Sequence, residues 1–103
     1  MTLPFDHADA PLFSVGQVAD MLGVQQAFLR RLDTHDVVSP ARSDGQQRRY
    51  SRIDVGQVQE AMALIDDGLT LPGVRRVLDL QQRVRDLEAQ LAAVRAEREA
   101  RRT

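Results

Sequence analysis

The chain has 103 residues, no cysteine and a formal net charge of −1. This length allows one compact domain with an appendage, and a single core of that size is only marginally stable without partner contacts. The absence of cysteine excludes disulfides, thiolate metal sites and cysteine redox sensing. Two isolated histidines, His7 and His35, do not make a zinc site, so we expect no metal and no cofactor.

The N-terminal residues lack the features of a signal peptide. Residues 1–10 carry acidic side chains but no lysine or arginine, and they contain no long apolar run. No later apolar run is long enough to span a bilayer. We therefore expect a soluble cytoplasmic protein without a membrane partner. Residues 1–12 show no helical or strand periodicity and are expected to form a flexible arm or a loosely packed strand.

A short helix is predicted immediately after this arm. Ser14 and Gln17 have the spacing of a capping box, in which each side chain bonds the backbone of the other residue. The apolar stripe of an amphipathic helix follows, made by Val15, Val18, Ala19 and Leu22. Gly23 can adopt the left-handed conformation that ends a helix.

A second short helix is expected from about Gln25 to about Thr34. Its apolar residues fall on one face, so Gln26, Arg30 and Arg31 point outward if that face packs on the first helix. This is the position of a DNA-recognition helix, and glutamine and arginine match the edges of adenine and guanine respectively. The alternative is a helical hairpin that packs only against protein.

The following stretch predicts a β-hairpin. Residues 37 and 38 are valines expected to form a short strand limited by Pro40, and residues 43–45 have turn chemistry. Arg48 to Tyr50 would form the return strand. A hairpin beside a helix-turn-helix is a wing, and its arginines could reach phosphates or a minor groove. Tyr50 could bond a phosphate or close the small core, and the two alternatives are nearly equal.

The basic residues of the chain are concentrated around these elements. All fourteen are arginine, whose planar fork suits bidentate contact with guanine or phosphate. Between residues 28 and 52, six arginines stand against three aspartates. The local surplus of positive charge predicts a nucleic-acid partner despite the near-neutral net charge.

Two more helices are predicted toward the C-terminus. Ser51 and Asp54 form a second capping box, opening a helix through about Ile65. Its buried side is expected to contain Ile53, Val58, Met62 and Ile65. Gly68 ends this helix, Thr70 caps the next, and Pro72 lies in the first turn of that helix, where proline is tolerated.

The last helix carries the heptad pattern of a coiled coil. Apolar residues recur at alternating three- and four-residue steps at Val77, Leu80, Val84, Leu87, Leu91 and Val94. At about 1.5 Å per residue this seam is roughly 26 Å long. A lone helix would leave the seam in water, so we expect a homodimer; packing of the seam onto the chain's own body is the alternative.

Together these residues resemble the MerR family of bacterial transcription regulators. The resemblance covers roughly residues 13–91. Within the family the chain is most similar to the short HspR-type heat-shock repressors, which share the Arg-Arg-Tyr-Ser end of the wing and the Leu-x-Gly-Val/Ile-Arg/Lys-Arg helix at residues 71–76. The other matching positions are residues 13–19, Gly23-Val24, Leu29-Arg30, Pro40, Arg42, Asp54 and residues 68–71.

The resemblance implies a mainly α fold with three parts. These are the flexible arm of residues 1–12, a winged helix-turn-helix DNA-binding domain over residues 13–76, and a long C-terminal coiled-coil dimerisation helix with a frayed tail over residues 77–103. The seam given above would be the dimer interface of an antiparallel coiled coil. The residues expected at DNA are Ser14, Gln25, Gln26, Arg30, Arg31, Arg42, Arg48, Arg49 and Tyr50.

The implied function is sequence-specific regulation of transcription in the stress response. A dimer of this type is expected to bind double-stranded DNA at a pseudo-palindromic promoter site as a repressor, with a chaperone such as DnaK as a candidate co-repressor. Metal-sensing relatives use cysteines near the coiled coil, and drug-sensing relatives add an effector domain for which no residues remain here.

Two other functions are weighed against this one. A protein-binding adaptor on the same fold, like the chaperone modulators, would bind DNA weakly or not at all. It is favoured by the near-neutral net charge and by Ala27 and Phe28, which stand where the family usually has other residues. An enzyme is not expected, because the sequence shows no paired-carboxylate, nucleophile–base or glycine-rich phosphate arrangement beyond chance.

Overall fold

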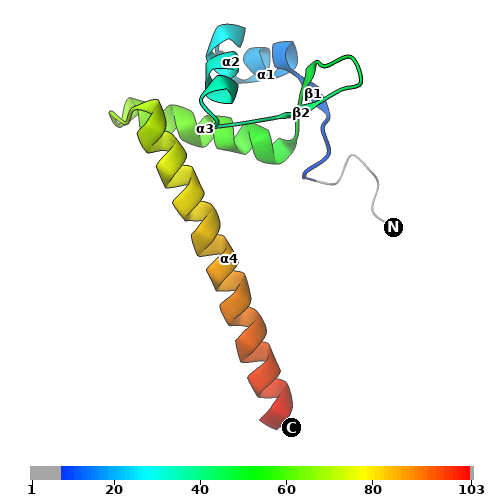
Figure 1. Cartoon of the computed structure of the whole chain (residues 1–103), viewed down its shortest axis with the longest axis vertical. Coiled ribbons are helices and arrows are strands. Elements are labelled where there is room, and N and C mark those ends of the chain that lie inside the picture. The colour runs from blue at the N-terminus through cyan, green and yellow to red at the C-terminus, as the bar shows by residue number, and fades with distance from the viewer. Residues whose placement is uncertain (1–7, 103) are drawn as a thin grey trace.

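The computed structural model describes residues 8–102; residues 1–7, which include His7, and Thr103 lie outside the described residues. Within that range the chain forms a small head from which one long helix extends (Figure 1). No helix in residues 8–102 is both long enough and apolar enough to cross a lipid bilayer. The elements in chain order are β1 (Phe13–Ser14), α1 (Val15–Leu22), α2 (Gln26–Thr34), β2 (Ala41–Arg42), β3 (Arg48–Tyr50), α3 (Arg52–Asp66) and α4 (Leu71–Arg102).

The helix-turn-helix forms as the local sequence predicts. Ser14 Oγ accepts from the Gln17 backbone N–H at 3.1 Å, and Gln17 Oε1 accepts from the Ser14 N–H at 2.8 Å, so the capping box is confirmed. Gly23 ends α1 with φ of +65°, a left-handed conformation that favours glycine. The second helix begins at Gln26, and Gln25 is its N-cap without a side-chain hydrogen bond.

The first strand of the wing is not where the sequence predicts it. Val37 and Val38 form a bend instead of a strand, and both of their N–H groups donate to the Leu32 carbonyl, at 2.8 and 3.3 Å. The two valine side chains are buried beneath the end of α2. Because these N–H groups satisfy a carbonyl at the end of α2, they are not available to a strand ladder. The first wing strand is β2, which follows Pro40.

The small sheet has the order β1-β3-β2 with both pairs antiparallel. Strand β3 is formed as predicted, whereas β1 was not expected from the sequence. Phe13 pairs with Tyr50 in the β1–β3 ladder. The chain before β1 continues along the head, where the Leu12 N–H donates to the Tyr50 carbonyl and the Ala8 carbonyl accepts from the Ile53 N–H, both at 3.1 Å. Residues 8–12 of the predicted arm are therefore attached to the domain.

The core lies where α1, α2, α3 and the first turns of α4 meet. Ile53 was predicted to be buried but is 49% exposed. It precedes Val58 by five residues, which at 3.6 residues per turn places it about 140° away from the buried face of α3. The fully buried large side chains are Tyr50, Leu29, Leu32, Val18, Val38, Val58 and Val74.

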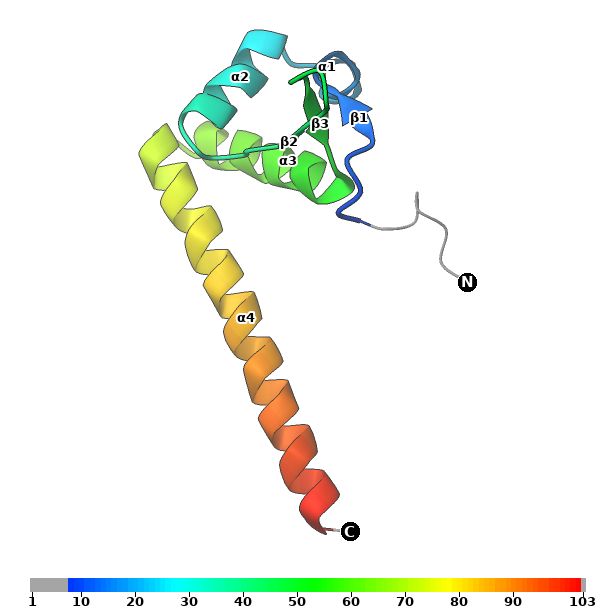
Figure 2. The ribbon, with the colours of Figure 1, turned by 45° about the vertical axis from the view of Figure 1, so that its right-hand side comes forward.

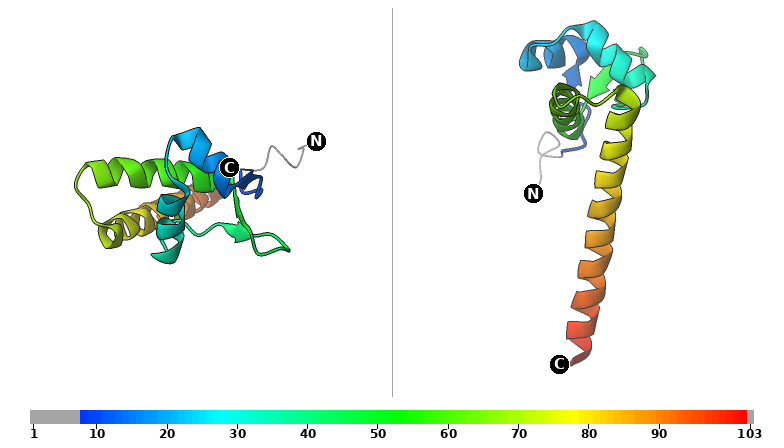
Figure 3. Two further views of the ribbon diagram at one scale, coloured as in Figure 1. Left: turned by 90° about the horizontal axis from the view of Figure 1, so that it is seen from above. Right: turned by 90° about the vertical axis from the view of Figure 1, so that its left-hand side faces the viewer.

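Helix α4 is one continuous helix of 32 residues. Thr70 Oγ1 accepts from the Gly73 N–H at 3.5 Å, and Val74 and Leu78 pack into the core of the head. The predicted domain boundary after residue 76 falls inside this helix, and the tail predicted to fray is helical to Arg102. Figures 2 and 3 show from several directions that most of α4 stands clear of the head.

Candidate nucleic-acid interface

A groove of about 350 Å³ separates α2 from the wing. It brings together five of the nine residues predicted to contact DNA, although they come from four different elements. The residues that line the groove are Ser14, Val15, Arg30, Arg42, Gln46, Gln47, Arg48 and Arg49. The sequence prediction of a joint surface made by the second helix and the hairpin is therefore matched by the geometry.

The two predicted base-reading residues of α2 are in contact with each other. Arg30 Nη2 donates to Gln26 Oε1 at 3.2 Å, and both side chains are exposed. The bond spans four residues, which places the two side chains on the same face of the helix one turn apart. Gln26 does not line the groove itself but is joined to it through Arg30.

The other two predicted residues of α2 lie outside the groove. Arg31 is exposed, and within residues 8–102 its guanidinium has no carboxylate partner. Gln25 is exposed at the start of the helix and borders a separate hollow with Val24 and Phe28. Both residues remain at the surface, but the geometry does not join them to the arginines of the wing.

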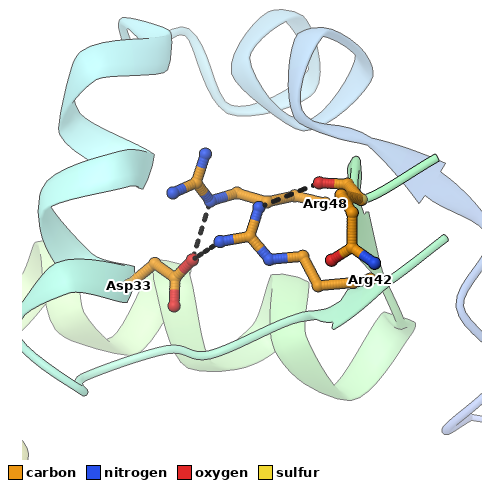
Figure 4. A network of polar contacts seen from close by, with 4 residues as sticks. Asp33, Arg42 and Arg48 are labelled. Carbon is orange, nitrogen blue, oxygen red and sulfur yellow. Dashed lines mark hydrogen bonds and ion pairs between the residues drawn. The ribbon is translucent and has the colours of Figure 1, made fainter. Parts of the chain in front are cut away.

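The wing arginines are organised by a residue that the sequence did not single out. Arg42 and Arg48 face each other in the β2–β3 ladder. Asp33, from the last turn of α2, accepts with Oδ2 from Arg42 Nη2 at 3.1 Å and from Arg48 Nε at 2.7 Å (Figure 4). One carboxylate faces two guanidinium groups, so this cluster keeps a positive charge.

The remaining wing arginine is held by neutral groups. Arg49 is half-buried, and it donates with Nη1 to the Arg48 carbonyl and with Nη2 to Gln47 Oε1, both at 3.3 Å. Among the described residues, neither Arg49 nor Arg30 has an ion pair with a carboxylate. Their charges are not neutralised within residues 8–102, and the groove therefore has the electrostatic character that phosphate requires.

Tyr50 belongs to the core and does not lie at the surface. Its side chain is 0% exposed, and its hydroxyl has no hydrogen-bond partner among the described residues. Burial raises the pKa of the Tyr50 hydroxyl above its usual value. Of the two alternatives for Tyr50, the structure shows the core one, because strand β3 turns the ring inward. Its predicted contact with DNA stays a prediction.

The heptad seam of α4 is exposed along most of its length. Val77 is half-buried against the head, whereas the exposed fractions of Leu80, Val84, Leu87, Leu91 and Val94 are 53, 52, 59, 48 and 52%. The alternative that the seam packs onto the chain's own body is therefore not what the structure shows. An open hollow of about 460 Å³ lies at the start of the seam, between α4 and Glu60 of α3.

A helix-turn-helix whose second helix lies beside a β-hairpin defines a winged helix-turn-helix protein. The family model for MerR HTH family regulatory proteins matches residues 13–81 of this chain. The chain belongs to the MerR family of helix-turn-helix regulatory proteins, which are transcription regulators and not enzymes. The resemblance found in the sequence is confirmed.

Two relatives with assigned names are similar over most of the chain. The heat shock protein HspR of Streptomyces coelicolor is 33% identical over 89 residues, which are 85% of this chain and 59% of HspR. The transcriptional regulator GlnR of Bacillus anthracis is 35% identical over 77 residues, which are 75% of this chain and 60% of GlnR. The chain thus spans about three fifths of the length of each relative.

Solved structures of MerR regulators share the fold. The N-terminal part of MtaN, a multidrug transporter activator of Bacillus subtilis, has a TM-score of 0.62 at 21% identity and covers 80% of this chain and 93% of that one. HiNmlR, a MerR regulator bound to promoter DNA, has a TM-score of 0.62 at 18% identity and covers 82% of this chain and 75% of that one. At these identities the likeness establishes the architecture alone.

Proposed function

We propose that this protein is a dimeric, sequence-specific DNA-binding regulator of transcription that acts as a repressor at a pseudo-palindromic promoter site. The observation that carries the proposal is the arginine-lined groove between α2 and the wing, in which one carboxylate faces two guanidinium groups. Support also comes from the family and from a solved relative bound to promoter DNA.

In this proposal α2 enters the major groove and the wing lies along the backbone. Gln26 and Arg30 face the base edges, because they are exposed and already joined by a hydrogen bond. Arg42, Arg48 and Arg49 contact phosphates, and these contacts set the position of the domain on the duplex.

Three further residues have supporting roles at the edge of this surface. The Ser14 hydroxyl accepts from the Gln17 N–H, which leaves its own proton free to donate to a phosphate. Gln25 lies at the positive end of α2, where a helix attracts phosphate, and Arg31 is exposed on the flank of the same helix. We place all three at the phosphate backbone, not at the bases.

Dimerisation through α4 supplies the second copy of this surface. Five seam residues are each about half exposed, and such a continuous apolar stripe on a helix is covered when a second copy packs against it. A two-fold dimer presents two recognition helices to two half-sites, which is why the site is proposed to be pseudo-palindromic.

Binding to promoter fragments over a range of salt concentrations tests the proposal. The wild-type protein is expected to bind one fragment more tightly than random DNA, with an affinity that falls steeply with salt. Arg49→Ala is expected to reduce the slope of log K against log salt by about 1, because one phosphate contact is lost. Arg102→Ala, at the far end of α4, removes the same charge outside the groove and is the control. Binding that shows neither site preference nor salt dependence contradicts the proposal.

A protein-binding adaptor is the second candidate function, and one observation favours it. An apolar hollow of about 310 Å³ lies between the start of α2 and the end of α3, lined by Val24, Gln25, Phe28, Met62, Ile65 and Asp66. A regulator that needs a chaperone co-repressor such as DnaK would use this hollow for the chaperone and the arginine-lined groove for DNA. Adding purified DnaK to the DNA-binding measurement separates these cases: an adaptor binds the chaperone in a reaction that Arg49→Ala does not affect, whereas a co-repressed regulator binds DNA more tightly when the chaperone is present.

A further inference from the structure

Two like charges lie directly opposite each other in the wing. Arg42 of β2 and Arg48 of β3 are partners in a ladder of two residue pairs. Like charges at opposed positions of antiparallel strands repel and destabilise the pairing. The ladder is too short to hold its geometry by backbone bonds alone, because β2 has two residues and β3 has three.

Apolar packing anchors strand β3 through the buried Tyr50, but it does not fix strand β2 or the turn of the wing. Ala41 and Arg42 are exposed, and so are the turn residues 44–47. The turn contains Gln46 with φ of +65°, a conformation that a non-glycine residue adopts at a cost. Within residues 8–102, the side-chain bonds that join the wing to α2 are those from Arg42 and Arg48 to Asp33.

We propose that Asp33 is the residue that positions the wing against the recognition helix. Its carboxylate comes from α2, relieves the repulsion between the two opposed arginines and ties both strands of the wing to the helix that reads the bases. With a side chain 16% exposed, it is more shielded from solvent than Arg42, at 44%, or Arg48, at 20%. The consequence for DNA recognition rests on the function proposed above.

The bonding pattern leaves the arginines able to bind phosphate. Asp33 takes the Nε–H of Arg48, and within residues 8–102 the Nη1 and Nη2 groups of Arg48 have no hydrogen-bond partner. Arg42 gives Nη2 to Asp33 and Nη1 to the Gln46 carbonyl, which also fixes the turn. Figure 4 shows Asp33 below both guanidinium groups, on the side of α2. Asp33 thereby orients the donors of Arg48 without occupying all of them.

A positioning role and a purely electrostatic role predict opposite results when Asp33 loses its charge. An anionic residue in a surface that binds phosphate lowers the general affinity for DNA, so its neutralisation should tighten non-specific binding. If Asp33 positions the wing, the same change should loosen the alignment of the wing with α2 and weaken binding to the specific site. The ratio of the two affinities therefore distinguishes the roles.

Asp36 provides a matched control. It lies three residues from Asp33 and carries the same charge, but it is 69% exposed and faces Arg75 at 3.9 Å, away from the wing. Its φ of +57° suits asparagine. Asp33→Asn and Asp36→Asn thus change the net charge equally, and only the first alters the wing contacts.

The first measurement compares the affinity for the promoter site with the affinity for random DNA. For Asp33→Asn the ratio of these affinities is expected to fall about ten-fold, which corresponds to about 1.4 kcal/mol, while random-DNA binding is unchanged or tighter. Asp36→Asn is expected to leave the ratio unchanged, and Asp33→Glu to recover part of it. An equal loss of both affinities in Asp33→Asn, or an unchanged ratio, overturns the proposal.

The second measurement uses the free protein and does not depend on DNA binding. The Nε–H proton of Arg48, bonded to a carboxylate, is expected to exchange slowly with solvent in NMR spectra of the wild type and of Asp36→Asn, and rapidly in Asp33→Asn, with the amides of α2 and α3 unchanged. An Arg48 signal that does not respond to Asp33→Asn overturns the positioning role. If the wild type shows no site preference, the proposed function fails while this measurement still decides whether Asp33 holds the wing.

Discussion

Arg30 Nη2 donates to Gln26 Oε1 at 3.2 Å, which joins two exposed side chains on the outer face of α2 one helical turn apart. A long arginine side chain loses rotamer freedom when it binds a base, and a neighbour that already holds it reduces that loss. The glutamine can therefore act in two ways at DNA: by its own contact and by holding the arginine in place.

Substitutions at this pair should affect specific binding more than general binding. Arg30→Ala is expected to weaken binding to the promoter site by about 1–3 kcal/mol, because a bidentate contact with a base edge is lost. Gln26→Ala is expected to have a smaller effect in the same direction. Fluorescence anisotropy with site and random duplexes measures both. Equal losses on the two duplexes would show that Arg30 contacts phosphate and not a base.

Tyr50→Phe should not harm DNA binding and should stabilise the fold. The Tyr50 hydroxyl is buried without a partner among the described residues, and an unpaired buried polar group costs about 1–3 kcal/mol. Its removal is expected to raise the melting temperature by several degrees, since about 1 kcal/mol corresponds to roughly 4–8 °C in a domain of this size. Thermal unfolding followed by circular dichroism measures the change. A lower melting temperature, or a weakened affinity for the site, would show that the hydroxyl has a partner.

Tyr50 should also make the fold sensitive to alkali. Burial raises its pKa in the folded state, so the folded protein retains this proton at a pH where the unfolded chain has lost it. The contribution of Tyr50 to stability is therefore expected to be constant below the unfolded pKa of about 10 and to fall as the pH rises above it. The chain has one tyrosine and no lysine or cysteine, so no other side chain titrates near that pH.

The absorbance of the phenolate follows this titration directly. The wild type is expected to ionise at a higher pH when folded than in denaturant, and Tyr50→Phe is expected to lose the fall in stability above about pH 10. Ionisation of Tyr50 at the same pH in the folded and denatured protein would contradict its burial.

The elements that sequence patterns predicted are those set by local interactions. Both capping boxes bond residues three apart, and Gly23 ends α1 through its own backbone conformation. The strand predicted at residues 37 and 38 is absent from the structure. Two adjacent valines favour a strand by propensity, but here their side chains are buried beneath the end of α2. Strand β1 has two residues and exists only through its pairing with β3.

The sequence predicts which charged residues form the candidate site, but it does not predict the hydrogen bonds and ion pairs that connect them. Arginine clusters on a helix and a hairpin are visible in the sequence. The role of Asp33 is not, because it depends on partners nine and fifteen residues away, brought together by the wing turn. The sequence left open whether Tyr50 contacts phosphate or closes the core. The side of a strand that faces the core depends on its register, and the sequence of a three-residue strand does not determine that register.

The exposed seam of α4 leads to a last prediction about assembly. Leu87 is 59% exposed at the middle of the seam, whereas Ala89 lies on the opposite side of the helix. Leu87→Asp is expected to give a monomer with a folded head, because a charge cannot be buried unpaired between two apolar stripes. Ala89→Asp adds the same charge off the seam and is expected to remain dimeric. Sedimentation equilibrium distinguishes the two variants.

The same pair of variants links assembly to DNA binding. A monomer contacts one half-site, so Leu87→Asp is expected to lose most of its affinity for a complete site and to bind a complete site no more tightly than a half-site. Ala89→Asp should bind the complete site as the wild type does. A wild type that sediments as a monomer, or a Leu87→Asp variant that binds the complete site with full affinity, would show that the seam serves some other contact.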